Sequence, residues 1–353
     1  MTVRERKVGV EIGARACLEH IFDWYRGMVS PTTGKFVYLY DPVRDEVVVD
    51  GEPIRNIATP ADVARLSRFL GRWELRTVVE RTIVYWESML TAKGDALVFD
   101  DALVGKPTGI AHSAFLILSM LEAELPRKEH DVRRLAEGIL RQQRADGSLK
   151  VWFGDRPDEG LEFYPGEALL ALLRVYEALG DARCLVAAER GFDFYRARYA
   201  RMGVSPTLLV FFANWQSQYG ARLYQHAGSE ALRGRVASFL YELHDRILAE
   251  GFYDRVAAEP GWQACVEVAC GLEGIAAAQA LASQEGDRTR AERYAEAARV
   301  ACAFLVHAQR LHHASARERG GFGQTLADRL QRIDVTGHAS NGLLRAVEAG
   351  LVR

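Results

Sequence analysis

Apolar residues recur at helical spacing along most of the chain. Between Glu167 and Ala200, leucine, alanine and aromatic residues stand at positions i, i+3, i+4 and i+7, with charged residues between them. This spacing is typical of amphipathic helices that bury one face. Strand-like alternation occurs mainly near residues 35–50, where Asp41-Pro42 separates two β-branched or aromatic runs and predicts one β-hairpin. Because strands and helices do not alternate further, the pattern predicts an all-α protein.

A second pattern repeats about every 50 residues, with a longer last step of about 70. Each repeat opens with a polar residue and continues as a helix of small apolar residues. These openings are Asp62, His112, Glu167, Gln218, Glu267 and His338. A longer and more charged helix follows each of the first five, at about residues 72–93, 128–144, 182–199, 229–249 and 286–311. The sixth small-residue helix, which opens with His338, is not followed by a charged helix. Its partner would be the N-terminal helix at about residues 8–28, packed beside it.

This repeat predicts an (α/α)6 barrel, a toroid that forms a single domain over residues 1–353. Six helical hairpins would place their small-residue helices inside and their charged helices outside. The helix at residues 8–28 would close the ring against the last helix, near residues 335–350. The extra length of the last step falls in Arg310–Asp334, which is rich in charge and glycine. We expect this segment to be a lid over the mouth of the barrel, with Gly320 and Gly321 as its hinge.

The architecture resembles the α/α-toroid superfamily, and the likeness covers nearly the whole chain. The strings RQQRADGSL (Arg141–Leu149) and GGFG (Gly320–Gly323) are similar to the turns that link hairpins in these toroids. The superfamily includes six-hairpin glycosidases, sugar epimerases and lyases and, more distantly, terpenoid cyclases and prenyltransferases. The acidic motifs D-x-D-D and D-D-x-x-D of terpenoid cyclases are missing, since Asp100-Asp101 is only a pair. The resemblance therefore implies a central cavity that takes a carbohydrate.

The openings of the inner helices supply the candidate catalytic residues. Backbone N–H groups at a helix N-terminus are unpaired and favour polar or anionic groups. In a closed ring these ends would converge on one pocket, and carboxylates and imidazoles there could exchange protons with a substrate. We expect Glu267, His338 and Glu167 to be catalytic, with Glu267 and His338 on neighbouring helices. The alternative is that each residue only caps or charges the start of its own helix.

Polar and aromatic side chains near these openings are candidates for substrate binding. Asp334 and Asn341 flank His338 within the string IDVTGHASNG. Indole and phenol rings beside amides and carboxylates suit a sugar, which has apolar faces and polar edges. The alternative is that these aromatic residues belong to the ordinary core between helices. The expected binding residues are His112, Tyr164, Trp215, Gln218, Trp262, Asp334 and Asn341.

Composition narrows the possible partners. Lys and Arg number 45 against 47 Asp and Glu, so the chain lacks the basic footprint of a nucleic-acid-binding protein. No apolar run approaches the roughly 18 residues of a membrane span, and no signal sequence stands at the N-terminus. The five dispersed cysteines contain no C-x-x-C and indicate a reducing, cytoplasmic compartment. Nothing in the sequence indicates an oligomeric state.

Cofactor and metal motifs are also missing from the sequence. No Walker loop, Rossmann G-x-G-x-x-G or H-E-x-x-H string is present. Cys265, Glu267 and His338 are acceptable zinc ligands, but the zinc-binding toroids use Asp, Cys and His, and no convincing Asp–Cys pair occurs. We therefore expect neither a cofactor nor a metal ion.

Two functions fit these observations. The favoured one is an enzyme that acts on a sugar, a uronic acid or a similar polar small molecule by acid/base chemistry. Hydrolysis needs two carboxyl groups, whereas epimerisation or elimination needs a base and an acid on opposite ring faces, which the mixture of Glu and His suits slightly better. The alternative is a non-catalytic toroid that binds a peptide or protein in its concave mouth. A deep pocket with perturbed titratable groups favours the enzyme, and a filled apolar centre favours the scaffold.

Overall fold

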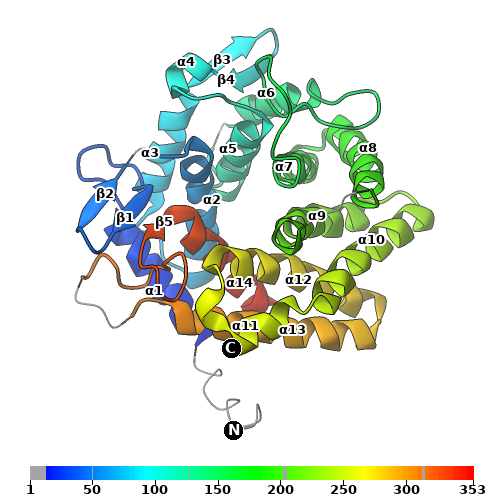
Figure 1. Ribbon diagram of the computed structural model, residues 1–353. Coiled ribbons are helices and arrows are strands. Elements are labelled where there is room, and N and C mark those ends of the chain that lie inside the picture. Colours follow the sequence, from blue (N-terminus) through cyan, green and yellow to red (C-terminus); the bar gives the residue numbers. More distant parts are fainter. Residues whose placement is uncertain (1–12, 50, 127, 202–204, 312–314) are drawn as a thin grey trace.

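Two concentric rings of helices form the molecule, and Figure 1 shows the inner ring almost along its axis. The computed structural model describes residues 13–49, 51–126, 128–201, 205–311 and 315–353. The inner helices are α2 (Pro53–Leu70), α5 (Ile110–Glu122), α7 (Tyr164–Leu179), α9 (Pro206–His226), α12 (Cys265–Glu285) and α14 (Ile333–Glu348). Each of them packs against the next in this order, and α14 packs against α2, so the ring is closed.

The outer ring supplies one partner for every inner helix. Its members are α1 (Ala14–Gly27), α3 (Arg76–Glu87), α6 (Glu129–Leu140), α8 (Ala182–Tyr199), α10 (Glu230–Ala249) and α13 (Arg288–Ala308). Helices α3 to α13 pack on the inner helix that precedes them, and α1 packs on α14. The predicted (α/α)6 barrel and its closure by the N-terminal helix are therefore confirmed. Residues 8–12 of the predicted first helix lie outside the described residues.

Gly-Asp pairs turn the chain within two of the hairpins. Gly180 and Gly286 end α7 and α12 with φ of 69° and 76°, a left-handed conformation that glycine adopts without strain. The aspartate that follows each glycine caps the next helix. Asp181 accepts a hydrogen bond from the backbone of Arg183, and Asp287 accepts one from that of Arg290.

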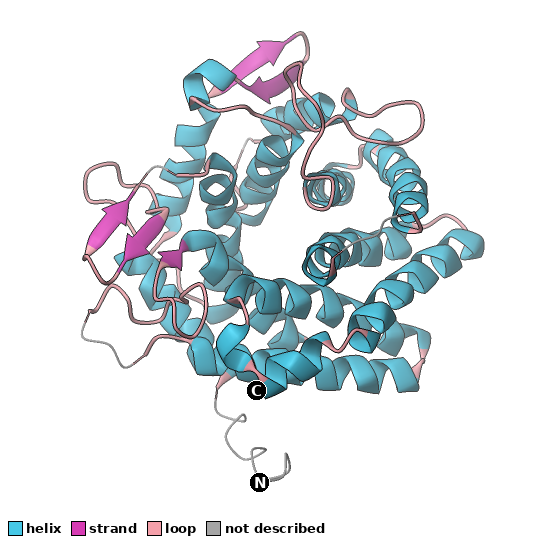
Figure 2. Ribbon diagram, in the orientation of Figure 1, coloured by secondary structure: helices cyan, strands magenta, loops and turns pink. Residues whose placement is uncertain are grey.

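Strands lie at the rim of the barrel (Figure 2). The predicted hairpin is present as β1 (Leu39–Asp41) and β2 (Glu46–Val48), and β5 (Gln331–Arg332) pairs antiparallel with β1. A second hairpin, β3 (Leu90–Lys93) and β4 (Ala96–Phe99), replaces the last part of the predicted helix 72–93. The prediction was wrong there because Gly94, with φ of 65°, makes a tight turn between two short apolar runs.

Helix α12 is both long and apolar. It is long enough to cross a membrane, and an 18-residue window of it has a mean hydropathy of 1.4. The expectation that no apolar run approaches this length was wrong here, because small residues rather than large ones make the window apolar. Of the window, 78% is buried inside the molecule, where α12 packs against α9, α13 and α14. Its composition is thus explained by its place in the core of the barrel.

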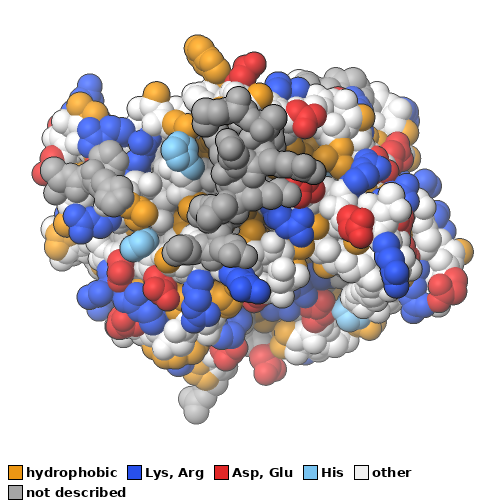
Figure 3. Space-filling view, turned by 90° about the horizontal axis from the view of Figure 1, so that it is seen from below, with side chains coloured by type: hydrophobic (Ala, Val, Ile, Leu, Met, Phe, Trp, Pro, Cys, Tyr) orange, Lys and Arg blue, Asp and Glu red, His pale blue; other side chains and the backbone are white. Residues whose placement is uncertain are grey.

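Charged side chains of both signs intermingle on the outside, as Figure 3 shows for one face of the molecule. The two remaining α-helices of the described chain, α4 (Asp101–Val104) and α11 (Phe252–Ala258), are short and lie outside the inner ring, and a 3-10 turn (Pro260–Trp262) follows α11. The mixed surface agrees with the formal net charge of -2.

The segment Arg310–Asp334, expected to be a lid, packs against α1 through residues 315–332. The side chain of Gln331 accepts a hydrogen bond from the Trp24 indole and donates one to the carbonyl of Glu318. Of the described residues of this segment, Arg332 and Asp334 line the central cavity. Gly320 and Gly321 lie directly against His20 and Trp24 of α1. Their lack of a side chain therefore serves close packing, and their role as a hinge stays a prediction.

Replacement of Gly320 by Ala tests this packing. Gly320 has φ of 95°, and an added Cβ would meet the carbonyl oxygen of His20. Left-handed strain and overpacking together should lower the free energy of unfolding by about 2–5 kcal/mol, measured by urea denaturation. Gly71→Ala is the matched control, because Gly71 has φ of 68° but no heavy atom within 4 Å of the added Cβ. Equal losses in both variants would contradict close packing at Gly320.

Candidate active site

A cavity of about 520 Å³ opens among the N-terminal halves of the inner helices. Aromatic rings form much of its wall, contributed by Phe115 of α5, Phe163 and Tyr164 at the start of α7, and Phe211 and Trp215 of α9. Polar side chains from α2, α7 and α14 lie among them: Arg55, Asp62, Glu167, Asp334, His338 and Asn341. All six inner helices contribute to the lining. The cavity is therefore a property of the closed ring.

Glu167 is a buried carboxyl group in the first turn of α7. Burial raises its pKa to about 8, although His338 and Arg55 act in the opposite direction. Its Oε2 atom has no hydrogen-bond partner among the described residues. Glu167 is therefore a neutral acid near pH 7, with a proton that a bound molecule could accept.

His338 lies in the middle of α14, and its ring stands edge-on to Trp215, with 6.0 Å between the ring centroids. Its Nδ1 atom donates a hydrogen bond of 2.7 Å to Oε1 of Glu273, which is buried on α12. Burial alone would lower the pKa of His338, but Cys270 and Glu273 outweigh burial and hold it well above its usual value. His338 is thus an imidazolium at neutral pH, oriented by Glu273.

Asp62 faces the same cavity from α2. Its Oδ1 atom accepts a hydrogen bond of 2.7 Å from Asn341. Burial raises the pKa of Asp62 to about 6, while Asn341 and Arg65 limit the rise. The carboxyl group is therefore ionised at neutral pH but close to its titration point, which is favourable for a group that accepts a proton.

Asp334 and two arginines form an ion-pair cluster at the edge of the cavity. Oδ2 of Asp334 lies 2.9 Å from Nε of Arg55 and 2.7 Å from a terminal nitrogen of Arg332. Burial would raise the pKa of Asp334, but the two guanidinium groups lower it below its usual value. Asp334 is therefore a fixed anion that holds both arginines at the cavity rather than a group that exchanges protons.

The structure brings six of the ten predicted site residues to the cavity. Two of them, Glu167 and His338, were predicted to be catalytic. The others were predicted to bind substrate, and they are Tyr164, Trp215, Asp334 and Asn341.

The four remaining residues do not line the cavity. Glu267 lies on a different side of α12, and Trp262 stands 85% exposed in the 3-10 turn before that helix. His112 is buried, and its Nδ1 atom accepts a hydrogen bond from the backbone of Gly109, so it caps α5. Gln218 is buried one turn beyond the cavity, where it donates a hydrogen bond to Glu273. The expectation that Glu267 and Trp262 would meet Glu167 there differs from the structure.

Three polar residues in or next to the cavity were not among the predicted site residues. Asp62 was recognised as an inner-helix residue but was not chosen for the site, and Arg55 and Glu273 were not chosen either. A signal for Glu273 exists in the helical spacing. Val266 and Cys270 line the cavity, and Glu273 follows them at i+7, on the same helix face.

Comparisons with known proteins agree on the fold. No family model and no curated protein matches the chain. Among solved structures, a sugar epimerase from a ruminal bacterium is 13% identical, with a TM-score of 0.69 over 96% of this chain and 98% of that chain. The unsaturated glucuronyl hydrolase of Bacillus sp. GL1, responsible for the degradation of glycosaminoglycan, is 14% identical, with a TM-score of 0.68 over 96% and 97%. A D-mannose isomerase is 12% identical, with a TM-score of 0.68 over 99% of both chains.

These similarities define the class of fold. The chain is a six-hairpin α/α toroid, as the sequence resemblance implied, and it matches such toroids over nearly their full length. At these identities the likeness concerns the fold, because one fold can carry unrelated chemistry. The chemistry of the cavity itself is therefore the evidence that bears on function.

Proposed function

We propose that this protein is an enzyme that acts on a sugar or sugar acid by acid/base chemistry in the central cavity. One observation carries the proposal: a neutral carboxylic acid, Glu167, and an ionised carboxylate, Asp62, line the same aromatic-walled cavity. Their pKa values of about 8 and about 6 bracket neutrality from opposite sides. Pairs of titratable groups with separated pKa values are typical of enzymes that need an acid and a base together.

In this mechanism each polar group has a distinct task. Asp62 accepts a proton from the substrate, and Glu167 donates one to it. His338, charged and held by Glu273, donates a hydrogen bond to the oxygen on which negative charge develops. The rings of Trp215 and Phe115 contact the apolar face of a sugar.

Related folds support the substrate class. The solved structures that this chain resembles include a glucuronyl hydrolase, a sugar epimerase and a D-mannose isomerase. Hydrolysis, epimerisation and elimination all need one acid and one base, so the reaction type within this class stays open. The described cysteines are all free and buried, which supports action in a reducing compartment such as the cytoplasm.

A substrate panel followed by proton NMR in D₂O tests the proposal. Monosaccharides, disaccharides and unsaturated uronides are incubated with the protein, because hydrolysis gives new anomeric signals, epimerisation incorporates deuterium and elimination creates a vinyl proton. We expect turnover of at least one compound, and a decrease of about 10²–10⁴-fold in Asp62→Asn. Folding of the variant is checked by circular dichroism.

Two results would contradict parts of this proposal. Full turnover by Asp62→Asn would remove Asp62 from the mechanism. A panel left unchanged by the wild-type protein, together with binding of a peptide in the cavity, would favour the scaffold function instead.

A further inference from the structure

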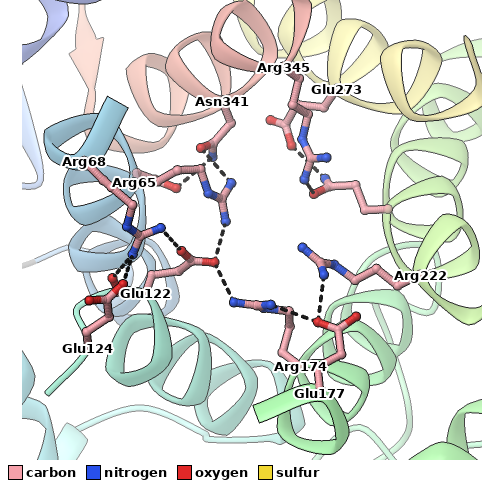
Figure 4. Close-up of polar contacts among 12 residues, drawn as sticks. Arg65, Arg68, Glu122, Glu124, Arg174, Glu177, Arg222, Glu273, Asn341 and Arg345 are labelled. Atoms are coloured by element: carbon pink, nitrogen blue, oxygen red, sulfur yellow. Dashed lines mark hydrogen bonds and ion pairs between the residues drawn. The ribbon is translucent and has the colours of Figure 1, made fainter. Parts of the chain in front are cut away.

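A second polar cluster lies inside the barrel, at the C-terminal halves of the inner helices (Figure 4). Four arginines point toward a common space and are named the arginine ring here. They are Arg65 of α2, Arg174 of α7, Arg222 of α9 and Arg345 of α14. The mechanism proposed above uses none of them.

Negative charge is distributed unequally around this ring. Glu122 accepts from Arg65 at 3.4 Å and from Arg174 at 3.2 Å. Arg222 shares one oxygen of Glu177 with Arg174. These contacts leave the side of the ring next to Glu122 well compensated.

Arg345 is placed differently from the other three. Its terminal nitrogen donates a hydrogen bond of 2.7 Å to the neutral amide of Gln218. Its Nε atom is buried and has no hydrogen-bond partner among the described residues. A guanidinium group carries five N–H donors, so Arg345 and Arg222, which both point into the common space, have donors to spare.

Short side chains lie beside these two arginines. Helix α12 lies between α9 and α14 in the ring, and at this level it carries Ala276–Ala278, whose side chains are short. The side chains of Arg65, Arg174 and Arg222 keep 24%, 23% and 35% of their surface accessible although they point inward. Part of each of these three side chains is therefore open to solvent.

Burial and neighbouring like charges disfavour the positive charge of Arg345. Burial lowers the pKa of Arg345 to about 10, and the charges of Arg65 and Arg222 act in the same direction, while the carboxylates of Glu273 and Glu348 offset this lowering only in part. A buried cation is stabilised when an anion with good hydrogen-bond geometry offsets the loss of its hydration. Arginine is suited to oxyanions, because two parallel N–H groups match two oxygens of a phosphate or sulfate.

We propose that the space between Arg222 and Arg345 is a binding site for a small oxyanion of the phosphate or sulfate type, flanked by Arg65 and Arg174. The spare donors of Arg345 and Arg222 bind the ligand, next to the short side chains of α12. This site is separate from the substrate cavity and does not depend on the proposed function.

Hydrogen bonds connect the oxyanion site to the cavity along two routes. In one, Arg65 donates to Asn341, which donates to Asp62. In the other, Arg345 donates to Gln218, which donates to Glu273, the partner of His338. A bound oxyanion would therefore change the electrostatic environment of both groups, and the site is placed to regulate them.

Isothermal titration calorimetry with inorganic phosphate tests the site, in a phosphate-free buffer at constant ionic strength. We expect saturable binding to the wild-type protein, a higher melting temperature with phosphate, and a weaker effect with chloride. Arg345→Gln and Arg222→Gln should each weaken binding at least about tenfold, because each removes charge-assisted hydrogen bonds. Arg183→Gln is the control, since Arg183 lies on the outside of α8 and pairs with Asp181 and Glu137.

The melting temperature without phosphate separates this site from a purely structural role. Removal of a buried cation whose charge is only partly compensated should leave the melting temperature of Arg345→Gln unchanged or higher, whereas loss of a structural arginine would lower it. Tighter binding of a phosphate monoester than of free phosphate would show that the site takes the end of a larger molecule, which supports it equally. Absence of phosphate binding at millimolar concentration, or equal binding by wild type and both ring variants, would overturn the proposal.

Discussion

Glu167→Gln should lower turnover by about 10²–10⁴-fold and, at the same time, make the folded protein more stable at alkaline pH. The loss of turnover follows from the loss of the group that donates the proton. The glutamine side chain would keep the shape of the original one, so binding of a sugar should change far less than turnover. A full rate in this variant would contradict the role of Glu167.

The gain in stability follows from the raised pKa of Glu167. Its folded-state pKa of about 8 lies above the ordinary value of 4.5, so between these values the folded state holds a proton that the unfolded state has released. The free energy of unfolding of the wild-type protein therefore falls by about 1.4 kcal/mol per pH unit from about pH 5 to about pH 8 on account of this residue. A glutamine side chain cannot ionise, so the free energy of unfolding of Glu167→Gln does not fall with pH on account of this position.

Urea denaturation at a series of pH values measures this difference. The two proteins should be similar near pH 5 and should diverge by about 3–5 kcal/mol at pH 8 and above. Glu159→Gln, an exchange in the loop before α7, is the control and should leave the pH dependence unchanged. A constant difference between wild type and Glu167→Gln across this range would show that Glu167 is ionised in the folded protein.

The barrel could be predicted from sequence because its repeat is long and its helices are strongly periodic. Each hairpin buries a stripe of small apolar residues, and six such stripes leave few arrangements other than a closed ring. The β3–β4 hairpin was missed because its two short runs, Leu90–Lys93 and Ala96–Phe99, continue the apolar pattern of α3. At that length periodicity does not separate a strand from the end of a helix.

The site was predicted less well, since position along a helix and direction around it are separate quantities. Glu267 stands at the start of α12, as expected, but it is one residue away from Val266, which lines the cavity. One residue turns the direction by about 100° around the helix. Asp62 and His338 lie well inside their helices and still reach the cavity, because the cavity extends inward from the helix starts, where Ile54 and Asp334 also line it.

The helix face gives a better rule for this chain than the helix start. On α14, Asp334, His338 and Asn341 line the cavity at i, i+4 and i+7, and Arg345 follows at i+11 in the arginine ring. On α9, Trp215 lines the cavity and Arg222 follows two turns later in the ring. Charged residues on such a stripe resemble an exposed face in the sequence. Only the pairing of several helices shows that they face the inside.

Glu122→Gln should therefore be strongly destabilising, although Glu122 looks in the sequence like a surface residue at the end of α5. Its carboxylate lies within 3.4 Å of guanidinium nitrogens of Arg65, Arg68 and Arg174, and it is buried. Burial alone would raise the pKa of Glu122, but Arg65, Arg174 and Arg68 outweigh it and lower the pKa to about 2. Loss of one partner from a buried ion-pair cluster typically costs about 3–5 kcal/mol.

Acid titration gives this prediction a second and independent readout. The folded-state pKa of Glu122 lies below its unfolded value of 4.5, so its contribution is present above about pH 4.5 and is lost as the pH falls toward about 2. The difference in unfolding free energy between wild type and Glu122→Gln should be largest near pH 7 and should shrink across this acidic range. Glu124→Gln is the matched control, because Glu124 also pairs with Arg68 but is 74% exposed, and exposed pairs contribute about 0–1 kcal/mol. If Glu122→Gln destabilised the protein no more than Glu124→Gln, the arginines of the ring would not need Glu122 as a counter-charge, and the unequal compensation inferred for the oxyanion site would lose its basis.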